Sequence, residues 1–144
     1  SIWYKESNSA VSMTTVDSNY NHACSIDQDG KLYCWGSNGD GQLGDLSTNR
    51  RSRPNPVRFA SDEPVVTQVS TSQYNTCLLT ETGRVMCWGD GAYGQNGQGS
   101  WNNDASLYDQ LIPTEVLLPW TSEAKMVSTG NRFACALIAD GSVY

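Results

Sequence analysis

Residues 22–36 read HACSIDQDGKLYCWG, and this stretch recurs further along the chain. It returns as NTCLLTETGRVMCWG at residues 75–89 and begins a third time as FACALIADGSVY at residues 133–144. The first cysteines of the three copies lie 53 and 58 residues apart. A period of this size indicates a repeat architecture, such as a propeller or a solenoid, in place of one ordinary domain.

Four cysteines fall into two pairs with the same spacing, and each pair brackets a turn that contains a glycine. If each copy folds into a hairpin about that turn, Cys24 faces Cys34 and Cys77 faces Cys87. Directly opposed residues of an antiparallel pair lie about 4.5–5.5 Å apart, which matches the Cα separation of a disulfide. We therefore predict two cross-strand disulfides.

Zinc is the alternative use of these cysteines, but their spacing disfavours it. Zinc sites usually pair cysteines as CxxC, and His22, the single histidine, cannot supply the missing ligands. Persistent disulfides form in oxidising compartments. We therefore expect the protein in the extracellular space, on a cell surface or in the periplasm.

Cys135 is the fifth cysteine, and it has no partner at the same offset within the 144 residues. We expect the parent chain to continue with a cysteine at the next position. A free reactive thiol and a bridge to another molecule remain the alternatives.

Composition supports a β-rich fold and disfavours two classes of partner. The chain has thirteen glycines, five tryptophans and seven tyrosines, a mixture that suits many short strands joined by turns. No apolar run approaches the roughly 20 residues that span a bilayer. The net charge of −6 opposes phosphate binding, so we expect no nucleic-acid partner.

The sequence divides into repeat units 1–53, 54–111 and 112–144, and the third is incomplete. Each complete unit is expected to form four short antiparallel strands, which is the content of one propeller blade. β-Branched and aromatic residues are enriched in these strands. In the second unit the expected strands are Pro56–Phe59, Val65–Val69, Thr76–Thr80 and Arg84–Trp88.

Residues 30–44, GKLYCWGSNGDGQLG, resemble the repeat of the regulator of chromosome condensation family. Residues 83–97 keep most of this motif but carry Asn96 where the family has leucine, and the third copy stops within it. The resemblance implies a β-propeller, commonly seven-bladed, of which this chain supplies about two blades and part of a third. The matching scaffold positions are Gly30, Trp35, Gly36, Gly41, Gln42, Gly44, Gly83, Trp88, Gly89, Gly94, Gln95 and Gly141.

The family name alone does not decide the function, because propellers host many roles. Founding members act on a small nuclear GTPase and on chromatin, whereas relatives serve as secreted binding proteins. The paired cysteines resemble the bacterial extracellular branch. Nothing outside the repeat motif matches the residues of a guanine-nucleotide exchange factor, so this activity is the least favoured hypothesis.

Several residue types that often carry chemistry are expected to belong to the scaffold. His22 is replaced by Asn75 and Phe133 in the other copies, which favours a structural or surface role. Asp27 and Asp29 precede a glycine and fit a hairpin turn better than a calcium loop. The remaining candidates are expected to be solvated carboxylates, namely Asp40, Asp45, Asp90, Asp104 and Asp109.

What does not repeat is the better guide to function, because insertions in a repeat scaffold map to loops on one face. The connections 46–53 and 98–111 differ completely in sequence. The first connection and the residues after it contain a basic cluster, which could also be an ordinary solvated loop. The second connection contains two aromatic residues. The candidate binding residues are Arg50, Arg51 and Arg53, with Arg58 nearby, and Trp101 and Tyr108.

We therefore predict a non-catalytic extracellular binding scaffold that needs no cofactor and no metal. Its partner would be a protein or a cell-surface ligand, or further copies or segments of the same propeller. The alternative function is structural, with units that join edge to edge into a ring, a fibre or a surface layer.

Overall fold

The computed structural model describes residues 3–6, 9–98, 109–119 and 123–144, and its regular elements in these ranges are all β-strands. The prediction of an all-β fold is confirmed. No helix in the described ranges is long and apolar enough to cross a membrane. The strands are β1 (Trp3–Glu6), β2 (Ser9–Asn19), β3 (His22–Asp27), β4 (Leu32–Gly36), β5 (Arg51–Pro56), β6 (Val66–Thr71), β7 (Asn75–Thr80), β8 (Val85–Gly89), β9 (Gln110–Glu115), β10 (Ala124–Thr129) and β11 (Ala134–Ile138).

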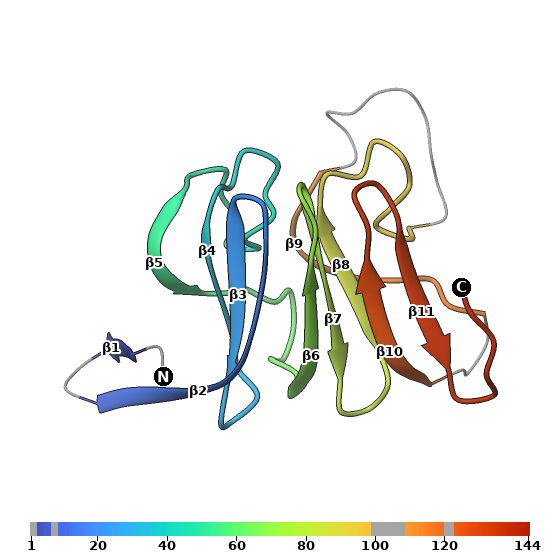
Figure 1. Cartoon of the computed structure of the whole chain (residues 1–144), viewed down its shortest axis with the longest axis horizontal. Coiled ribbons are helices and arrows are strands. Elements are labelled where there is room, and N and C mark those ends of the chain that lie inside the picture. Colours follow the sequence, from blue (N-terminus) through green and yellow to red (C-terminus); the bar gives the residue numbers. More distant parts are fainter. Residues whose placement is uncertain (1–2, 7–8, 99–108, 120–122) are drawn as a thin grey trace.

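The strands form three antiparallel sheets, which lie side by side in chain order (Figure 1). The first has the order β1-β2-β3-β4-β5, the second β6-β7-β8-β9, and the third contains β10 and β11. Strand β1 pairs only with residues 9–12 at the start of the long strand β2. The first sheet is therefore a four-stranded unit, β2 to β5, with β1 added on the extension of β2.

A disulfide joins the two central strands of each complete sheet. The register places Cys24 opposite Cys34 and Cys77 opposite Cys87, and the Cα atoms of each pair are 4.1 Å apart. Both predicted disulfides are therefore present. Each closes the same hairpin in its own sheet, so neither one links two sheets.

The boundaries of the sheets differ from the boundaries of the repeat units in the sequence. Strand β5 pairs with β4 and completes the first sheet, although its last residues open the second sequence unit. The expected strand at Pro56–Phe59 is therefore wrong, because only Pro56 belongs to a strand. Strand β9 completes the second sheet in the same way. Both outer strands contain proline, which lacks an N–H donor and is tolerated at a sheet edge.

The apolar core lies between neighbouring sheets. One cluster joins Ile26, Leu32 and Leu43 of the first unit to Val66 and Trp88 of the second. A second cluster joins the face of β7 and β8 that carries Leu79 and Val85 to Ala124, Val127 and other residues of the third sheet. Each sheet therefore buries its apolar residues against the next sheet, which is how a propeller forms its core.

Polar side chains join the innermost strands of successive sheets. Asp17 of β2 accepts hydrogen bonds from the backbone N–H and the hydroxyl of Thr71 in β6, at 2.6 and 2.8 Å. Gln68 of β6 donates to the backbone oxygen of Val127 in β10 and accepts from its N–H, at 2.8 and 3.0 Å. These bonds align the inner strands without a continuous backbone ladder.

Glycine is required where β4 and β8 end. Gly36 and Gly89 have φ angles of 109° and 97°, a backbone region that residues other than glycine rarely occupy. A Cβ at Gly36 would lie 2.7 Å from the Cα of His22, and one at Gly89 would lie 2.8 Å from the Cα of Asn75. The glycine of the repeated Trp-Gly pair therefore has a backbone role in both sheets.

The hairpin turn of the first sheet is held by Asp27. Its Oδ1 accepts hydrogen bonds from the backbone N–H groups of Asp29 and Lys31, each at 2.9 Å. This is the Asx-type geometry of a tight turn. The structure therefore gives Asp27 the turn role that its position before glycine suggests.

Candidate functional site

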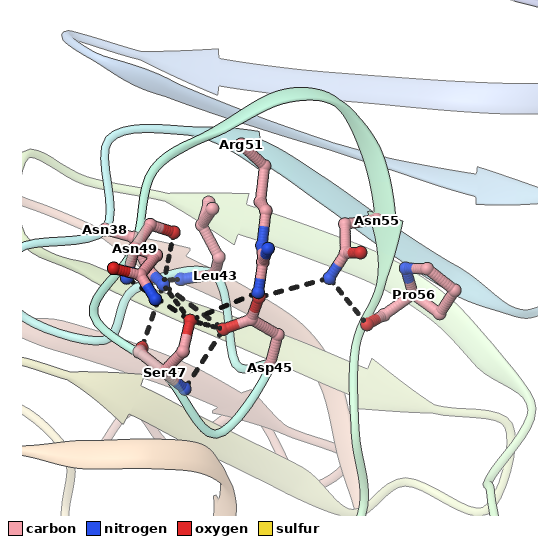
Figure 2. Close-up of polar contacts among 8 residues, drawn as sticks. All are labelled: Asn38, Leu43, Asp45, Ser47, Asn49, Arg51, Asn55 and Pro56. Atoms are coloured by element: carbon pink, nitrogen blue, oxygen red, sulfur yellow. Dashed lines mark hydrogen bonds and ion pairs between the residues drawn. The ribbon is translucent and has the colours of Figure 1, made fainter.

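The connection between β4 and β5 is ordered around a buried carboxylate, Asp45 (Figure 2). The side chain of Asp45 is only 1% exposed. Its Oδ1 accepts hydrogen bonds from the N–H and the hydroxyl of Ser47, at 3.1 and 2.7 Å. Its Oδ2 accepts from Arg51 Nε at 2.6 Å and from Asn55 Nδ2 at 3.2 Å. Asp45 therefore ties the loop to strand β5.

Asn38 holds the same loop from its other end. Its Nδ2 donates to the backbone oxygens of Ser47 and Asn49, at 2.8 and 3.1 Å, and its Oδ1 accepts from the N–H of Leu43 at 2.9 Å. It also donates to Asp45 at 3.2 Å. The loop thus has a polar core of its own, visible at the centre of Figure 2.

The expectation that Asp45 is a solvated carboxylate is wrong. Burial by itself raises the pKa of Asp45, but hydrogen bonds from Ser47 and Arg51, the charge of Arg51 and a hydrogen bond from Asn38 together hold it below the ordinary value of 3.8. The spacing of Asp45 and Ser47 is that of an Asx turn. That spacing is the signal from which its role could be found in the sequence.

An open cavity of about 710 Å³ lies beside this loop, at the end of the first sheet. Within the described residues Arg50 has no ion-pair partner, and its side chain is exposed. Arg51 has its charge paired with Asp45. Among the residues that the structure describes, the cavity therefore has one positive charge without an ion-pair partner, that of Arg50, and a polar wall. Its lining residues are Asn21, Gly36, Ser37, Arg50, Arg51 and Ser52.

The structure thus brings two of the candidate binding residues, Arg50 and Arg51, to one cavity. Arg53 and Arg58 are exposed but do not line it. Trp101, Tyr108 and the carboxylate Asp104 lie outside the described residues. Sequence reasoning missed Asn21 and Ser37, because neither belongs to a charged cluster or to an unrepeated connection.

The corresponding end of the second sheet carries carboxylates. Strand pairing places Gln110 opposite Gly89, as it places Arg51 opposite Gly36, so Asp109 stands where Arg50 stands in the first sheet. Burial raises the pKa of Asp109, a hydrogen bond from Gly91 lowers it, and the charges of Asp90 and Asp40 raise it further.

These three carboxylates are half-buried, so the expectation of full solvation is too simple for them. In the described part of the chain, no group of three or more His, Cys, Asp or Glu side chains is placed to hold a metal ion. Asp90 and Asp109 therefore make this end of the second sheet negative where Arg50 stands in the first sheet, and Asp40, from the β4–β5 loop of the first sheet, lies near enough to add to that negative charge.

His22 lies at the contact between the first and second sheets and is 4% exposed. Its Nε2 is 2.8 Å from the hydroxyl of Thr76, and that hydroxyl donates to the backbone oxygen of Gln42 at 2.9 Å. Because the hydroxyl has a single hydrogen, Nε2 must donate to it, which leaves Nδ1 unprotonated and without a partner among the described residues. His22 therefore has a structural role.

The pKa of His22 follows from this geometry. Burial lowers it from 6.5 to about 4, although the negative charge of Asp17 opposes the shift. Protonation would add a donor at Nδ1 where no acceptor is present within the described structure. The imidazole is therefore neutral near pH 7.

Comparison with known proteins agrees with this architecture. The sequence profile described as "Regulator of chromosome condensation (RCC1) repeat" matches residues 13–42 and 66–95, and a second profile of the same description matches residues 29–79. Together the matches extend from residue 13 to residue 95, more than half of the chain. The ultraviolet-B receptor UVR8 of Arabidopsis thaliana is 40% identical over 93 residues, which are 65% of this chain and 20% of that receptor.

Solved structures show the same fold at low sequence identity. Human WBSCR16 matches 97% of this chain with a TM-score of 0.82 and 18% identity, and the match covers 34% of that protein. Yeast RCC1 (Prp20), solved bound to Kap60, matches 92% of this chain with a TM-score of 0.75 and 20% identity. There the match covers 31% of the yeast protein. The sheets described above are therefore blades of a β-propeller, of which this chain forms a part.

Proposed function

The chain belongs to the regulator of chromosome condensation (RCC1) repeat family, and on that premise we propose that it binds a protein partner without catalysing a reaction. We place the contact at the cavity beside Arg50, at the end of the first blade. The propeller of this family is a protein-binding scaffold, and the yeast relative was solved with Kap60 bound. The chain spans 20% of UVR8 and about a third of the two solved relatives, so the proposal concerns the surface of these blades.

The observation that carries this proposal is the polar core of the loop between β4 and β5. Asp45 and Asn38 hold the loop in one conformation through hydrogen bonds to Ser47, Asn49 and Arg51. An ordered loop loses less conformational entropy on binding than a flexible one. Binding residues are disproportionately found on loops that a rigid scaffold positions, and this loop is positioned by its bonds to β5.

The charge of this surface favours an acidic segment of the partner. Arg50, Arg53 and Arg58 are exposed in a chain whose net charge is −6. Positive side chains at the edge of a contact attract an acidic partner, raise the association rate and make binding sensitive to salt. The neighbouring blade has Asp90 and Asp109 at the equivalent end, which would repel the same segment.

We also propose that the protein works in an oxidising compartment, where the disulfides of the two hairpins persist. Two buried disulfides, Cys24–Cys34 and Cys77–Cys87, support this proposal. When the protein is isolated from its source and unfolded in the presence of an alkylating agent, these four cysteines should remain unlabelled. Labelling of all four would contradict the proposed compartment.

Fluorescence anisotropy with short labelled peptides tests the partner chemistry. A ten-residue peptide of alternating glutamate and glycine is expected to bind, whereas lysine–glycine and serine–glycine peptides of equal length are not. Reversing two charges, with Arg50→Glu and Arg53→Glu, should weaken binding at least ten-fold.

The matched control reverses the same amount of charge away from the cavity, with Lys31→Glu and Lys125→Glu, both at exposed positions. It should change the affinity for the acidic peptide by less than three-fold. Equal losses in both double variants would show that binding follows net charge alone, and the proposed site would be wrong.

A further inference from the structure

Leu46 is an apolar residue with a strained backbone on the surface of the loop between β4 and β5. Its φ angle is 63°, in the left-handed region that residues other than glycine occupy at a cost in free energy. Its side chain is 59% exposed and belongs to neither of the two apolar clusters of the core. The core therefore does not account for a leucine at this position.

Glycine would meet the backbone requirement here. Residues 41–46 read GQLGDL, and residues 94–99 of the second repeat unit read GQNGQG, so the equivalent residue in the sequence is a glycine. The bonds that hold the backbone at Leu46 involve no atom of its side chain. The N–H and the hydroxyl of Ser47 donate to Asp45, and the N–H of Leu46 donates to the backbone oxygen of Leu111 at 3.1 Å. A strained residue of this kind is retained for a contact outside the fold.

The surroundings of Leu46 combine an apolar neighbour with a positive charge. Leu111 of β9 is half-buried, and a Cβ at Gly41 would lie 2.5 Å from its Cδ2, so Leu111 packs over this glycine at the contact between the two blades. Arg50 follows Leu46 by four residues, is exposed and has no ion-pair partner among the described residues. The polar core of the loop holds this whole stretch in one conformation (Figure 2).

We infer that Leu46 is the apolar contact of the recognition surface, and that the partner's segment carries an apolar side chain among its acidic ones. This inference rests on the proposed function, in which the carboxylates of the segment lie beside Arg50. An apolar side chain that packs on Leu46 and Leu111 leaves water, which adds affinity independently of charge. The ordered loop presents both contacts at a fixed spacing, so it favours this segment over one that is only acidic.

The occupant is a segment of another protein. A two-fold contact between copies of this chain, centred on Leu46, would bring their two Arg50 side chains close together, and like charges oppose such a contact. An acidic segment instead complements Arg50 while its apolar residue covers Leu46.

Three ten-residue peptides of equal charge test this inference by fluorescence anisotropy. EGEGEGEGEG is the acidic probe of the proposed function, EGELEGEGEG has leucine in place of one glycine, and EGESEGEGEG has serine there. The leucine peptide should bind the wild-type chain at least five-fold more tightly than the serine peptide. If the acidic probe binds and leucine adds nothing, this inference fails and the proposed function stands. If no peptide binds, both are wrong.

Leu46→Gly removes the side chain and suits the backbone conformation. It should reduce the advantage of the leucine peptide over the serine peptide to less than two-fold. Its midpoint of urea unfolding should equal or exceed that of the wild type, because glycine occupies this region without strain. The matched control is Leu117→Gly, at a 70% exposed position beyond the end of β9, and it should keep the full advantage of the leucine peptide.

Three outcomes would overturn the inference. The first is an advantage of the leucine peptide that persists in Leu46→Gly. The second is a lower urea midpoint of this variant, which would give the Leu46 side chain a role in the fold. The third is a dimer that dissociates only in Leu46→Gly, because it would assign Leu46 to a contact between copies. Light scattering at the assay concentration should instead give the same mass for the wild type and this variant.

Discussion

The indole Nε1 of Trp88 donates a hydrogen bond of 2.9 Å to the backbone oxygen of Gln42, and this bond joins the second blade to the loop of the first. The hydroxyl of Thr76 donates to the same oxygen at 2.9 Å. Trp88 is fully buried, and it packs in the apolar cluster shared by both blades. Trp88 therefore adds a large apolar contact and a specific polar bond to the other contacts that join the two blades.

Replacing Trp88 by alanine should lower the free energy of unfolding by about 3–5 kcal/mol, since it removes a buried indole and leaves a cavity. Urea unfolding followed by circular dichroism measures the loss. Trp35 provides a matched control, because it occupies the same motif position but is only half-buried. Trp35→Ala should cost less than half as much, and equal costs would contradict the role given to the blade contact.

Each disulfide should stabilise the fold by about 2.5–3 kcal/mol, because it closes a loop of ten residues in the unfolded chain. The double variant Cys24→Ala with Cys34→Ala should lose this amount in urea unfolding. The equivalent variant at Cys77 and Cys87 should lose a similar amount, and Cys135→Ala should change stability by less than 1 kcal/mol. A larger loss at Cys135 would contradict this ranking.

Stability should depend on pH through His22. The unfolded histidine binds a proton below about pH 6.5, whereas the folded one does so only near pH 4, so the unfolded state holds more protons between these values. The free energy of unfolding should therefore fall by up to about 3 kcal/mol as the pH drops from 6.5 to 4.

His22→Asn isolates this effect, because the equivalent buried position of the second blade is Asn75. The difference in stability between wild type and this variant should change over pH 6.5 to 4. If the two stability curves run parallel over that interval, His22 does not titrate as described.

Asp45→Asn should destabilise the fold by roughly 2 kcal/mol near pH 7, because it weakens charge-assisted hydrogen bonds to a buried group. The pKa of Asp45 is held below 3.8, so this contribution is present above that pH and is lost as the pH falls below it. Glu115→Gln is the control, since the Arg84–Glu115 pair is exposed and should contribute less than 1 kcal/mol. Equal losses in the two variants would contradict the burial of Asp45.

The sequence was enough to predict the blades, the disulfide register and the scaffold glycines, because all three follow from local spacing that repeats in the chain. The end of each blade was harder to predict. Strand β5 crosses the boundary between the first and second sequence units and pairs with β4, and nothing local to residues 51–56 shows which sheet it joins. Pairing between distant segments is decided by tertiary contacts.

The candidate site was only partly predictable for a similar reason. Arg50 and Arg51 stand out as basic residues of an unrepeated loop, but their different roles depend on Asp45. The carboxylate is bound by two residues of the loop and two of β5, so its burial depends on how the loop folds back. Asn21 reaches the cavity only because the turn between β2 and β3 lies beside the end of β4.

Hydrogen exchange with and without the glutamate–glycine peptide tests the proposed recognition surface most directly. The account predicts slower exchange of the backbone amides at residues 21, 37 and 50–52, which line the cavity of the first blade, and little change in the hairpin β10–β11. Protection confined to the third blade, or no protection beside Arg50 at a peptide concentration that saturates binding, would contradict it.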